Sequence, residues 1–325
     1  SIPLLQGVGY VADNKFFIAE APKFQPRLVA TVAYGFAPRS IDASKDGKYV
    51  FLAGSNFEGQ MRCAFIYKID LSTGAVSVFY KIPAFGSDPK ISEEFREIQV
   101  SPDGEKLLVK FSQSNERQPR LDYSFILNTH TGAVESNSKK YPSYFYFLND
   151  KKILALDVKY TEATKTSQTT AREITTSDFQ VKKTFALEKG VATFFHQSAK
   201  YLFDESNNTF IYPSAHSSGS YNIVQLDLTN QKIAKTALPD AAEKPYYSCV
   251  TVLPKSKKLL CGGSKNVTVI DGKSLKTDIV LGETTPFIAN YIRYNASHDV
   301  LLVSSLGFAR FFEMGGSSLQ INVYV

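Results

Sequence analysis

The stretch EIQVSPDGEKLLVKFSQSNERQPRLDYSFILNTHTGAVES, from Glu97 to Ser136, decides the fold. Its first apolar segment, Glu97–Val100, runs into Ser101-Pro102-Asp103-Gly104, where Pro fixes φ and Gly supplies a positive φ, so a tight turn is predicted. The apolar run Leu107–Phe111 completes a hairpin, and Tyr123–Leu127 predicts a third strand that turns into a fourth. The stretch therefore predicts one four-stranded antiparallel unit.

The rest of the chain repeats this unit. The residue directly before each second strand marks the hairpin turn, and these residues are Lys48, Lys106, Lys152, Lys200, Lys258 and Asp299. A turn between the third and fourth strands is predicted at Asp70–Gly74, Asn128–Gly132, Thr175–Asp178, Asp227–Asn230, Asp271–Lys273 and Glu313–Gly316. Four-stranded sheets repeated around an axis form a β-propeller. We expect an all-β fold, a seven-bladed β-propeller with four-stranded antiparallel blades.

We expect residues 1–325 to form a single propeller domain. Its blades are expected at about 38–89, 90–140, 141–189, 190–244, 245–289 and 290–325, after a partial first blade at about 1–37. In that partial blade, Val8–Val11, Phe16–Ala21 and Leu28–Tyr34 are expected as the second, third and fourth strands, the first being missing or irregular. The C-terminal strand Leu319–Val325 is expected to close the ring against the N-terminal segment.

Two segments depart from the repeat. Tyr160–Asp178 is rich in Thr, and we expect a long connection followed by a short third strand there. Asp204–Ser220 is rich in Ser and Asn, and we expect another long connection between the second and third strands. Long loops on a rigid scaffold often carry function.

Charge and hydropathy favour neither nucleic acid nor membrane as a partner. The formal net charge is +6, but Lys lies mostly at turns, where it keeps sheet edges apart. A nucleic-acid surface needs basic residues and aromatic residues together on one face, and no such cluster occurs. No apolar run reaches the roughly 18 residues of a membrane span, so none is expected.

The three cysteines leave the redox state open. Cys249 and Cys261 flank a turn symmetrically, so we expect them opposite each other on neighbouring strands, either bonded or as two reduced core residues. Cys63 is the third, and no CxxC spacing occurs. A bond would fit an oxidising compartment, and a first residue other than Met fits a removed signal peptide. The expected location is periplasmic or secreted.

The sequence predicts neither a metal site nor a cofactor site. The histidines, His130, His196, His216 and His298, fall in different blades or on opposite faces, so convergence on one metal is not expected. Neither a GxSxG motif nor a phosphate-binding glycine loop occurs. Aspartates at or beside turns are expected to accept hydrogen bonds from nearby backbone N–H groups, and these are Asp42, Asp46, Asp70, Asp103 and Asp227.

The segment Arg27–Gly54, RLVATVAYGFAPRSIDASKDGKYVFLAG, resembles the repeat of YVTN-type propellers. The matching residues are Val29-Ala30-Thr31-Val32, Gly35, Pro38, Asp46-Gly47 and Val50-Phe51-Leu52. Ser101–Leu108, SPDGEKLL, is similar to the same element and to the propeller repeats of the periplasmic Tol system. The resemblance, which covers roughly the first 140 residues, implies the propeller fold. It also implies either a surface-layer or periplasmic binding propeller or a lactonase-like enzyme.

A candidate ligand site follows from the starts of the first strands, which converge at the channel of a propeller. Arginine offers planar bidentate donors and tyrosine an amphipathic wall, which together suit a small anionic or polar ligand. The predicted ligand-binding residues are Arg39, Arg96, Glu97, Tyr144, Tyr246, Tyr247, Tyr291 and Arg293. The alternative is that Arg39, Arg96 and Glu97 merely pair with one another between adjacent blades.

The expected function is non-enzymatic binding of a protein partner or an extended ligand on one face. The alternative is a lactonase-like hydrolase with its site at the central channel mouth. Because no catalytic constellation is predicted, binding is the preferred interpretation.

Overall fold

The structure is a computed structural model of the chain. The residues that it describes are 2–4, 7–20, 25–58, 61–82, 92–115, 118–138, 144–161, 166–186, 202–215, 221–230, 232–237, 249–253, 258–262, 267–271, 274–281, 291–295, 300–305, 308–313 and 320–324. The chain divides into two compact units, residues 1–156 with 172–184 and residues 157–171 with 185–325.

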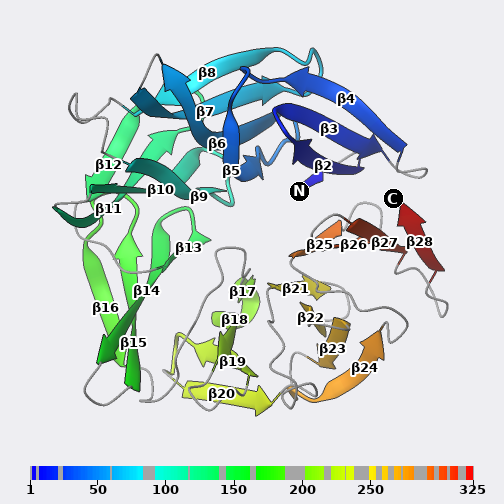
Figure 1. The fold of residues 1–325 in the computed structure, drawn as a ribbon. Coiled ribbons are helices and arrows are strands. Elements are labelled where there is room, and N and C mark those ends of the chain that lie inside the picture. The colour runs from blue at the N-terminus through cyan, green and yellow to red at the C-terminus, as the bar shows by residue number, and fades with distance from the viewer. Residues whose placement is uncertain are drawn as a thin grey trace. The chain divides into compact units, whose positions relative to one another are not determined.

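Within the described residues, the strands form seven four-stranded sheets, and in each sheet the strands are neighbours in chain order (Figure 1). The first sheet contains β1 (Ile2–Leu4), β2 (Gly7–Ala12), β3 (Lys15–Glu20) and β4 (Gln25–Thr31). The second sheet contains β5 (Ala37–Ala43), β6 (Tyr49–Glu58), β7 (Met61–Asp70) and β8 (Val76–Lys81). The third sheet contains β9 (Ser92–Val100), β10 (Lys106–Asn115), β11 (Gln118–Asn128) and β12 (Val134–Ser138).

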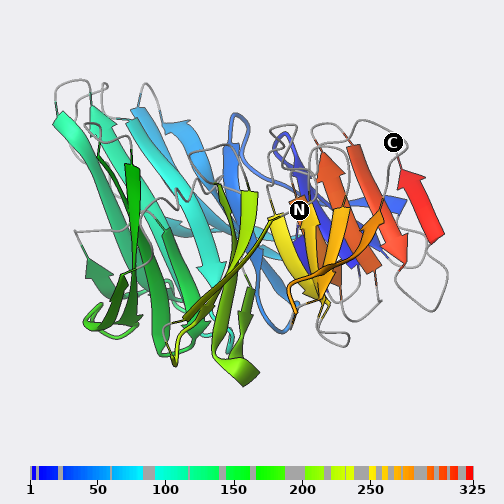
Figure 2. The ribbon, with the colours of Figure 1, turned by 90° about the horizontal axis from the view of Figure 1, so that it is seen from below.

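The remaining four sheets follow the same order, and Figure 2 shows their strands from a second direction. The fourth sheet contains β13 (Tyr144–Asn149), β14 (Lys152–Thr161), β15 (Thr166–Thr175) and β16 (Val181–Ala186). The fifth contains β17 (Leu202–Asp204), β18 (Thr209–Ala215), β19 (Tyr221–Asp227) and β20 (Lys232–Ala237), with the 3-10 turn Glu205–Asn207 after β17. The sixth contains β21 (Cys249–Leu253), β22 (Lys258–Gly262), β23 (Val267–Asp271) and β24 (Thr277–Leu281). The seventh contains β25 (Tyr291–Asn295), β26 (Val300–Ser305), β27 (Phe308–Glu313) and β28 (Gln320–Tyr324).

The strands at the two chain ends complete the first and the seventh sheet. The first sheet already has four strands, because Ile2–Leu4 pairs with Gly7–Gly9 as a short first strand. At the other end, β28 pairs with β27 inside the seventh sheet. The first blade is therefore not partial, and the closure of the ring by Leu319–Val325 stays a prediction.

The fifth sheet is shifted relative to the sequence-based strand assignment. Asp204–Ser220 was expected to be a long connection, but it contains the second strand β18. The turn before β18 ends at Asn208, whose carbonyl accepts the N–H of Leu228 at 3.0 Å, as the carbonyl of Lys48 accepts that of Leu71 at 2.9 Å. Asn208 therefore replaces Lys200 as the marker of this hairpin, and Lys200 lies outside the described residues.

The third strand of the fourth sheet also differs from expectation. Tyr160–Asp178 was expected to hold a long connection and a short strand, but β15 is 10 residues long. Of its described side chains, Ala171 and Ile174 are buried and the others are partly exposed.

Side-chain alternation explains how the sheets of the first unit stack. In β6, Val50 and Leu52 belong to a buried cluster with the first sheet, including Phe16 and Ile18. The intervening Phe51 and Ala53 point to the opposite face and pack in a second cluster with the third sheet. Because successive residues of a strand face opposite sides, each sheet contributes one apolar face to each neighbour.

The turn between the third and fourth strands is a repeated structure. In the second sheet the Gly74 N–H donates to the Asp70 carbonyl at 2.8 Å, and in the third the Gly132 N–H donates to the Asn128 carbonyl at 2.9 Å. Asp70 Oδ1 also accepts the N–H groups of Ser72 and Thr73, at 2.8 and 3.0 Å. The predicted aspartate–backbone bonds are confirmed at Asp46, Asp70, Asp103 and Asp227.

The backbone register corrects the expected position of two cysteines. Cys249 pairs with Gly262, whereas Cys261 pairs with Val250. The turn is thus centred between residues 255 and 256, because Leu253 pairs with Lys258. Cys249 and Cys261 are not cross-strand partners, and the third cysteine, Cys63, is buried in the core of the first two sheets.

Candidate ligand-binding site

The first strands of the second, third and fourth sheets are joined by side chains that accept backbone N–H groups. The Ile98 N–H donates to Ser40 Oγ at 3.0 Å, and the Val100 N–H donates to Asp42 Oδ2 at 2.7 Å. Further on, the Phe147 N–H donates to Gln99 Oε1 at 3.0 Å. These bonds fix β5, β9 and β13 side by side at a defined level.

Two of the links occupy the same place in the repeat. Asp42 precedes Ala43, which pairs with Val50, and Gln99 precedes Val100, which pairs with Leu107. Val50 and Leu107 each lie at the start of the second strand of their sheet. Asp42 and Gln99 are therefore equivalent residues that perform the same contact toward the following sheet.

The same alignment makes Arg39 and Arg96 equivalent, and both lie on a β-bulge. In β5, Pro38 pairs with Gly54 and Ser40 with Ala53, so Arg39 is the extra residue of the bulge. In β9, Phe95 pairs with Phe111 and Glu97 with Lys110, so Arg96 is the extra residue there. Bulges redirect side chains and are common near binding sites. Of these two side chains, the structure describes that of Arg39, which is exposed.

The backbone at the Arg39 bulge is tightly constrained. A Cβ on Gly54 would lie 2.3 Å from the Ala37 carbonyl oxygen and 2.5 Å from the Phe36 ring. Only a glycine permits this close approach of β6 to the start of β5. The bulge is therefore held by packing on its inner side while Arg39 faces solvent.

The other predicted site residues divide into three groups. Glu97 is half-buried in β9, next to Arg96. Tyr144 is the first residue of β13, three residues before Phe147, and therefore lies at the level of Glu97. Tyr291 and Arg293 lie in β25 of the second unit, where they pair with Ser304 and Leu302. Tyr246 and Tyr247 lie outside the described residues.

Tyr34 was not among the predicted site residues, because it was expected at the end of the strand Leu28–Tyr34. In the structure β4 ends at Thr31, and the Tyr34 side chain is 96% exposed in the loop before β5. The signal was Gly35, whose φ of +77° forms the turn. Tyr34 therefore lies at the same end of the second sheet as the Arg39 bulge.

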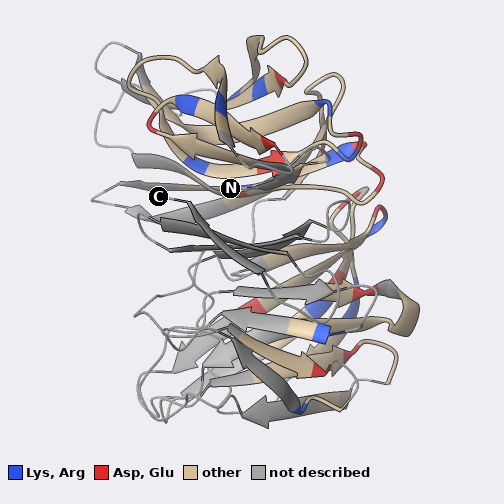
Figure 3. Cartoon of the chain, turned by 90° about the vertical axis from the view of Figure 1, so that its right-hand side faces the viewer, with Lys and Arg blue, Asp and Glu red and all other residues tan. Residues whose placement is uncertain are grey.

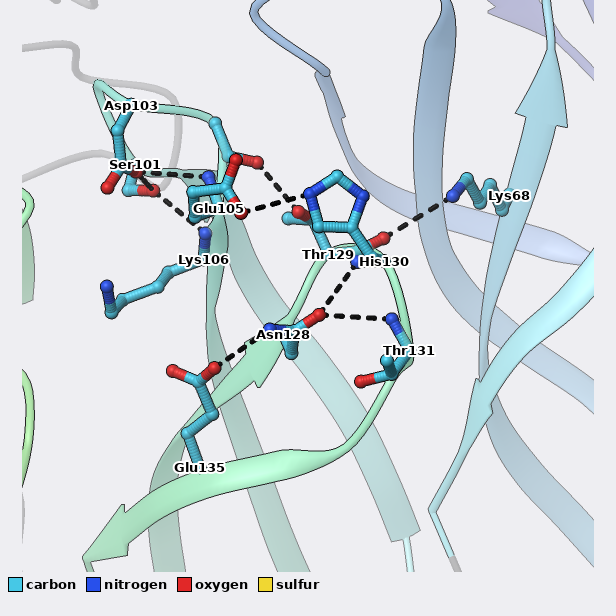
Figure 4. Close-up of polar contacts among 11 residues, drawn as sticks. Lys68, Ser101, Asp103, Glu105, Lys106, Asn128, Thr129, His130, Thr131 and Glu135 are labelled. Atoms are coloured by element: carbon cyan, nitrogen blue, oxygen red, sulfur yellow. Dashed lines mark hydrogen bonds and ion pairs between the residues drawn. The ribbon is translucent and has the colours of Figure 1, made fainter.

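A polar cluster surrounds His130 at the opposite end of the third sheet (Figure 4). His130 Nε2 lies 3.0 Å from Glu105 Oε2, and both side chains are more than half exposed. Asn128 Oδ1 accepts the N–H groups of His130 and Thr131, at 3.0 and 3.1 Å. The Thr129 hydroxyl donates to the Gly104 carbonyl at 2.7 Å. These contacts shape the two turns of this sheet, and His196, His216 and His298 lie outside the described residues.

In the part of the chain that the structure describes, basic and acidic residues are interspersed along the strands and turns (Figure 3). In the same residues, no cluster of three or more His, Cys, Asp or Glu side chains could hold a metal ion. Nor does this part contain a helix long and apolar enough to cross a membrane.

Comparison with known proteins identifies the fold. No protein-family model matches the chain, and no curated protein matches its sequence. An oligogalacturonate lyase in complex with manganese has a TM-score of 0.62 and 12% identity, covering 94% of this chain and 81% of the other. A putative 6-phosphogluconolactonase from Bacteroides uniformis ATCC 8492 has a TM-score of 0.64 and 11% identity, covering 95% and 90%. A chain of the mitotic checkpoint complex has a TM-score of 0.62 and 10% identity, covering 90% and 82%.

These structures are β-propellers, and the present chain shares their fold. The predicted all-β propeller class is thereby confirmed. At this level of identity the likeness shows the fold alone, because one fold carries many activities.

Proposed function

We propose that this protein is a non-enzymatic β-propeller that binds an extended anionic ligand, foremost a segment of a protein partner, on one face. The seven sheets act as seven blades of one domain, and the protein works in the periplasm or as a secreted protein. The ligand contacts the end of the propeller at which the first strands begin. Arg39 and Arg96 contact its anionic groups, with Glu97 and Tyr144 beside them.

One observation carries this proposal. Arg39 and Arg96 occupy the same bulge position on two neighbouring first strands, and those strands are joined by N–H groups of β9 that donate to the Ser40 and Asp42 side chains of β5. A repeated bulge brings the backbones of two arginines to one level, and a pair of arginines suits a ligand with repeated negative charges. Long-range attraction between such charges also speeds association at low salt.

The second candidate is a lactonase-like hydrolase, because the fold that this chain shares with a putative 6-phosphogluconolactonase is compatible with such an activity. In this case the same arginines would bind an anionic substrate, and a general base would have to come from another residue of the same face. Lactone hydrolysis distinguishes the two candidates, because only a hydrolase would catalyse it.

The test is titration calorimetry of the purified protein at low salt with two anionic polymers, polyglutamate and oligogalacturonate. The double variant Arg39→Ala/Arg96→Ala should bind at least about tenfold more weakly, since two charge-assisted contacts are removed. Arg27→Ala is the matched control, because this exposed arginine pairs with Glu20 at 2.6 Å in the first sheet and away from the bulges. Its affinity should stay within about twofold of the wild type.

Two results would overturn the binding proposal. One is a wild-type protein that binds neither polymer, and the other is a double variant that binds as tightly as the control. Hydrolysis of 6-phosphogluconolactone above the uncatalysed rate, followed by acid release, would instead establish the second candidate.

A further inference from the structure

The most exposed large apolar side chain of the described residues is that of Tyr34. The other exposed large apolar side chains, those of Leu28, Val78, Val134 and Val181, lie in the fourth strand of their sheets and are only 44–55% exposed. Tyr34 is 96% exposed and lies in the loop between β4 and β5. Partial exposure is ordinary for an outer strand, whereas an aromatic ring held almost wholly in water is not explained by packing.

The loop that carries Tyr34 is anchored on both sides. Before it, the Val32 N–H donates to the Asn14 carbonyl at 2.8 Å, and Asn14 Nδ2 donates back to the Val32 carbonyl at 2.9 Å. After it, Phe36 is buried, and its ring packs edge-on against Tyr67 with the centroids 5.0 Å apart. The Phe36 N–H closes the turn on the Ala33 carbonyl at 3.2 Å.

This anchoring matters for binding energy. A side chain on a rigid loop loses little conformational entropy when a partner covers it. Tyrosine gives a large amphipathic surface with few rotatable bonds, and tyrosine and arginine are the residues most enriched at the energetic centres of protein interfaces. Tyr34 therefore has the properties of a prepared contact residue.

The charges around Tyr34 indicate what the partner carries. Lys15, which pairs with Thr31 at the end of β4, and Arg39, five residues beyond Tyr34, are both exposed. Asp13 of the adjoining turn is exposed and acidic, so the charges of Lys15, Arg39 and Asp13 sum to one positive charge. A partner with acidic residues complements this surface.

We propose that Tyr34 is the anchor of a protein-docking surface, and that the partner is an extended acidic segment with an apolar side chain seated on the Tyr34 ring. This inference rests on the proposed function, because it identifies the ligand of the Arg39 face as protein. The Arg39 and Arg96 guanidinium groups contact the acidic residues of the segment. The Tyr34 ring contacts its apolar side chain, and polyglutamate has no such side chain.

The experiment selects random peptides displayed on phage against the wild-type protein and then measures the affinity of an enriched synthetic peptide by fluorescence anisotropy. Enriched sequences should combine acidic residues with an aliphatic or aromatic one. Tyr34→Ala should lower the affinity for the peptide by about tenfold or more. Tyr34→Phe keeps the ring, so its affinity should stay within about threefold of the wild type. Val78→Ala, a truncation of a 55% exposed side chain in β8, is the matched control and should change nothing.

The results show whether the Tyr34 anchor alone is wrong or whether the proposed anionic site is wrong as well. If Arg39→Ala/Arg96→Ala lowers the affinity for the peptide but Tyr34→Ala does not, Tyr34 is not the anchor and the proposed anionic site is still supported. If neither lowers this affinity, both are wrong. A selection that enriches no binder, or only peptides without acidic residues, also overturns the inference. Because Tyr34 is almost fully exposed, its variants should unfold at the wild-type temperature, which a thermal scan checks.

Discussion

The Val100 N–H donates to Asp42 Oδ2 at 2.7 Å, so a side chain of β5 completes the hydrogen bonding of β9 in the next sheet. The edge of a first strand would otherwise leave this N–H without a partner as the sheets pack together. Gln99 repeats the contact toward Phe147 at 3.0 Å. Polar side chains thus align the strands from which the proposed binding face begins.

Asp42→Ala should lower the free energy of unfolding by about 1–3 kcal/mol, because it removes the acceptor of a partly buried N–H. Asp42→Asn keeps an oxygen in the same place and should recover most of the loss. Urea unfolding followed by circular dichroism measures both. Equal stability of Asp42→Ala and the wild type would show that the contact contributes nothing to folding.

Changing a turn glycine to Ala should lower the stability most at Gly74, less at Gly132 and least at Gly104. All three have positive φ, which alone disfavours Ala by about 1 kcal/mol. A Cβ at Gly74 would lie 2.4 Å from the Val29 carbonyl oxygen, and one at Gly132 would lie 2.8 Å from that of Phe79. At Gly104 the nearest atom is the Lys45 Cβ, at 3.2 Å.

The backbone clashes at Gly74 and Gly132 should add roughly 1–3 kcal/mol, because an overpacked site must shift. Gly104→Ala is the control, because it has the same unfavourable positive φ but no close approach to a backbone oxygen. Thermal unfolding temperatures measure the series. If Gly74→Ala were as stable as Gly104→Ala, the close approach of this turn to β4 would be wrong.

Asp70 should contribute to stability above acidic pH. The Ser72 hydroxyl, together with the N–H groups of Thr73 and Ser72, holds the pKa of the Asp70 carboxyl below its ordinary value. Since the folded pKa is lower than the unfolded one, the contribution is fully present above the unfolded pKa. It is lost as the pH falls through the folded pKa.

Asp70→Asn separates titration from hydrogen bonding. The third sheet has Asn128 at the same turn position, and its Oδ1 accepts the same two N–H groups. The variant should therefore fold normally at neutral pH and lose less stability than the wild type upon acidification. Unfolding temperatures measured across acidic pH check this, and parallel curves for the two proteins would contradict it.

The repeat could be predicted from sequence where turn chemistry is local. Ser101-Pro102-Asp103-Gly104 forms the expected turn, with the Gly104 N–H bonded to the Ser101 carbonyl at 2.9 Å. The fifth sheet was misassigned because its turn uses Asn208, with a φ of 49°, in place of the expected lysine. Asparagine tolerates the left-handed region, so the Asp204–Asn208 cluster was the available signal.

The turn after the third strand shows why other repeats were hidden. Gly74 and Gly132 have counterparts in Phe179 and Leu275, which adopt φ of 55° although they are bulky. Both are buried, at 9% and 6% exposure, so packing offsets a backbone conformation that such residues avoid. Local propensity alone could not predict them.

The candidate site was predictable only in part. The equivalence of Arg39 and Arg96 on neighbouring first strands follows from the repeat, but their bulges do not, and β9 begins at Ser92, ahead of the start that the repeat predicts at Glu97. A bulge depends on the register between two strands, which is set by distant contacts such as Gly54 against Ala37. The loop of Tyr34 depends likewise on Asn14, which lies 18 residues from Val32 in the chain.

The last prediction concerns the cysteines of the sixth sheet. A disulfide between adjacent antiparallel strands needs both cysteines in one cross-strand pair, and the register pairs Cys249 with Gly262 and Cys261 with Val250. Cys249 and Cys261 should therefore both react with iodoacetamide in denaturant without reductant. Val250→Cys, which places a cysteine opposite Cys261, is the matched variant and should form a bond upon oxidation. Intact mass before and after reduction gives the number of alkylated cysteines in both proteins. If the wild-type chain took up two more alkyl groups only after reduction, the register of β21 on β22 would be wrong by one residue.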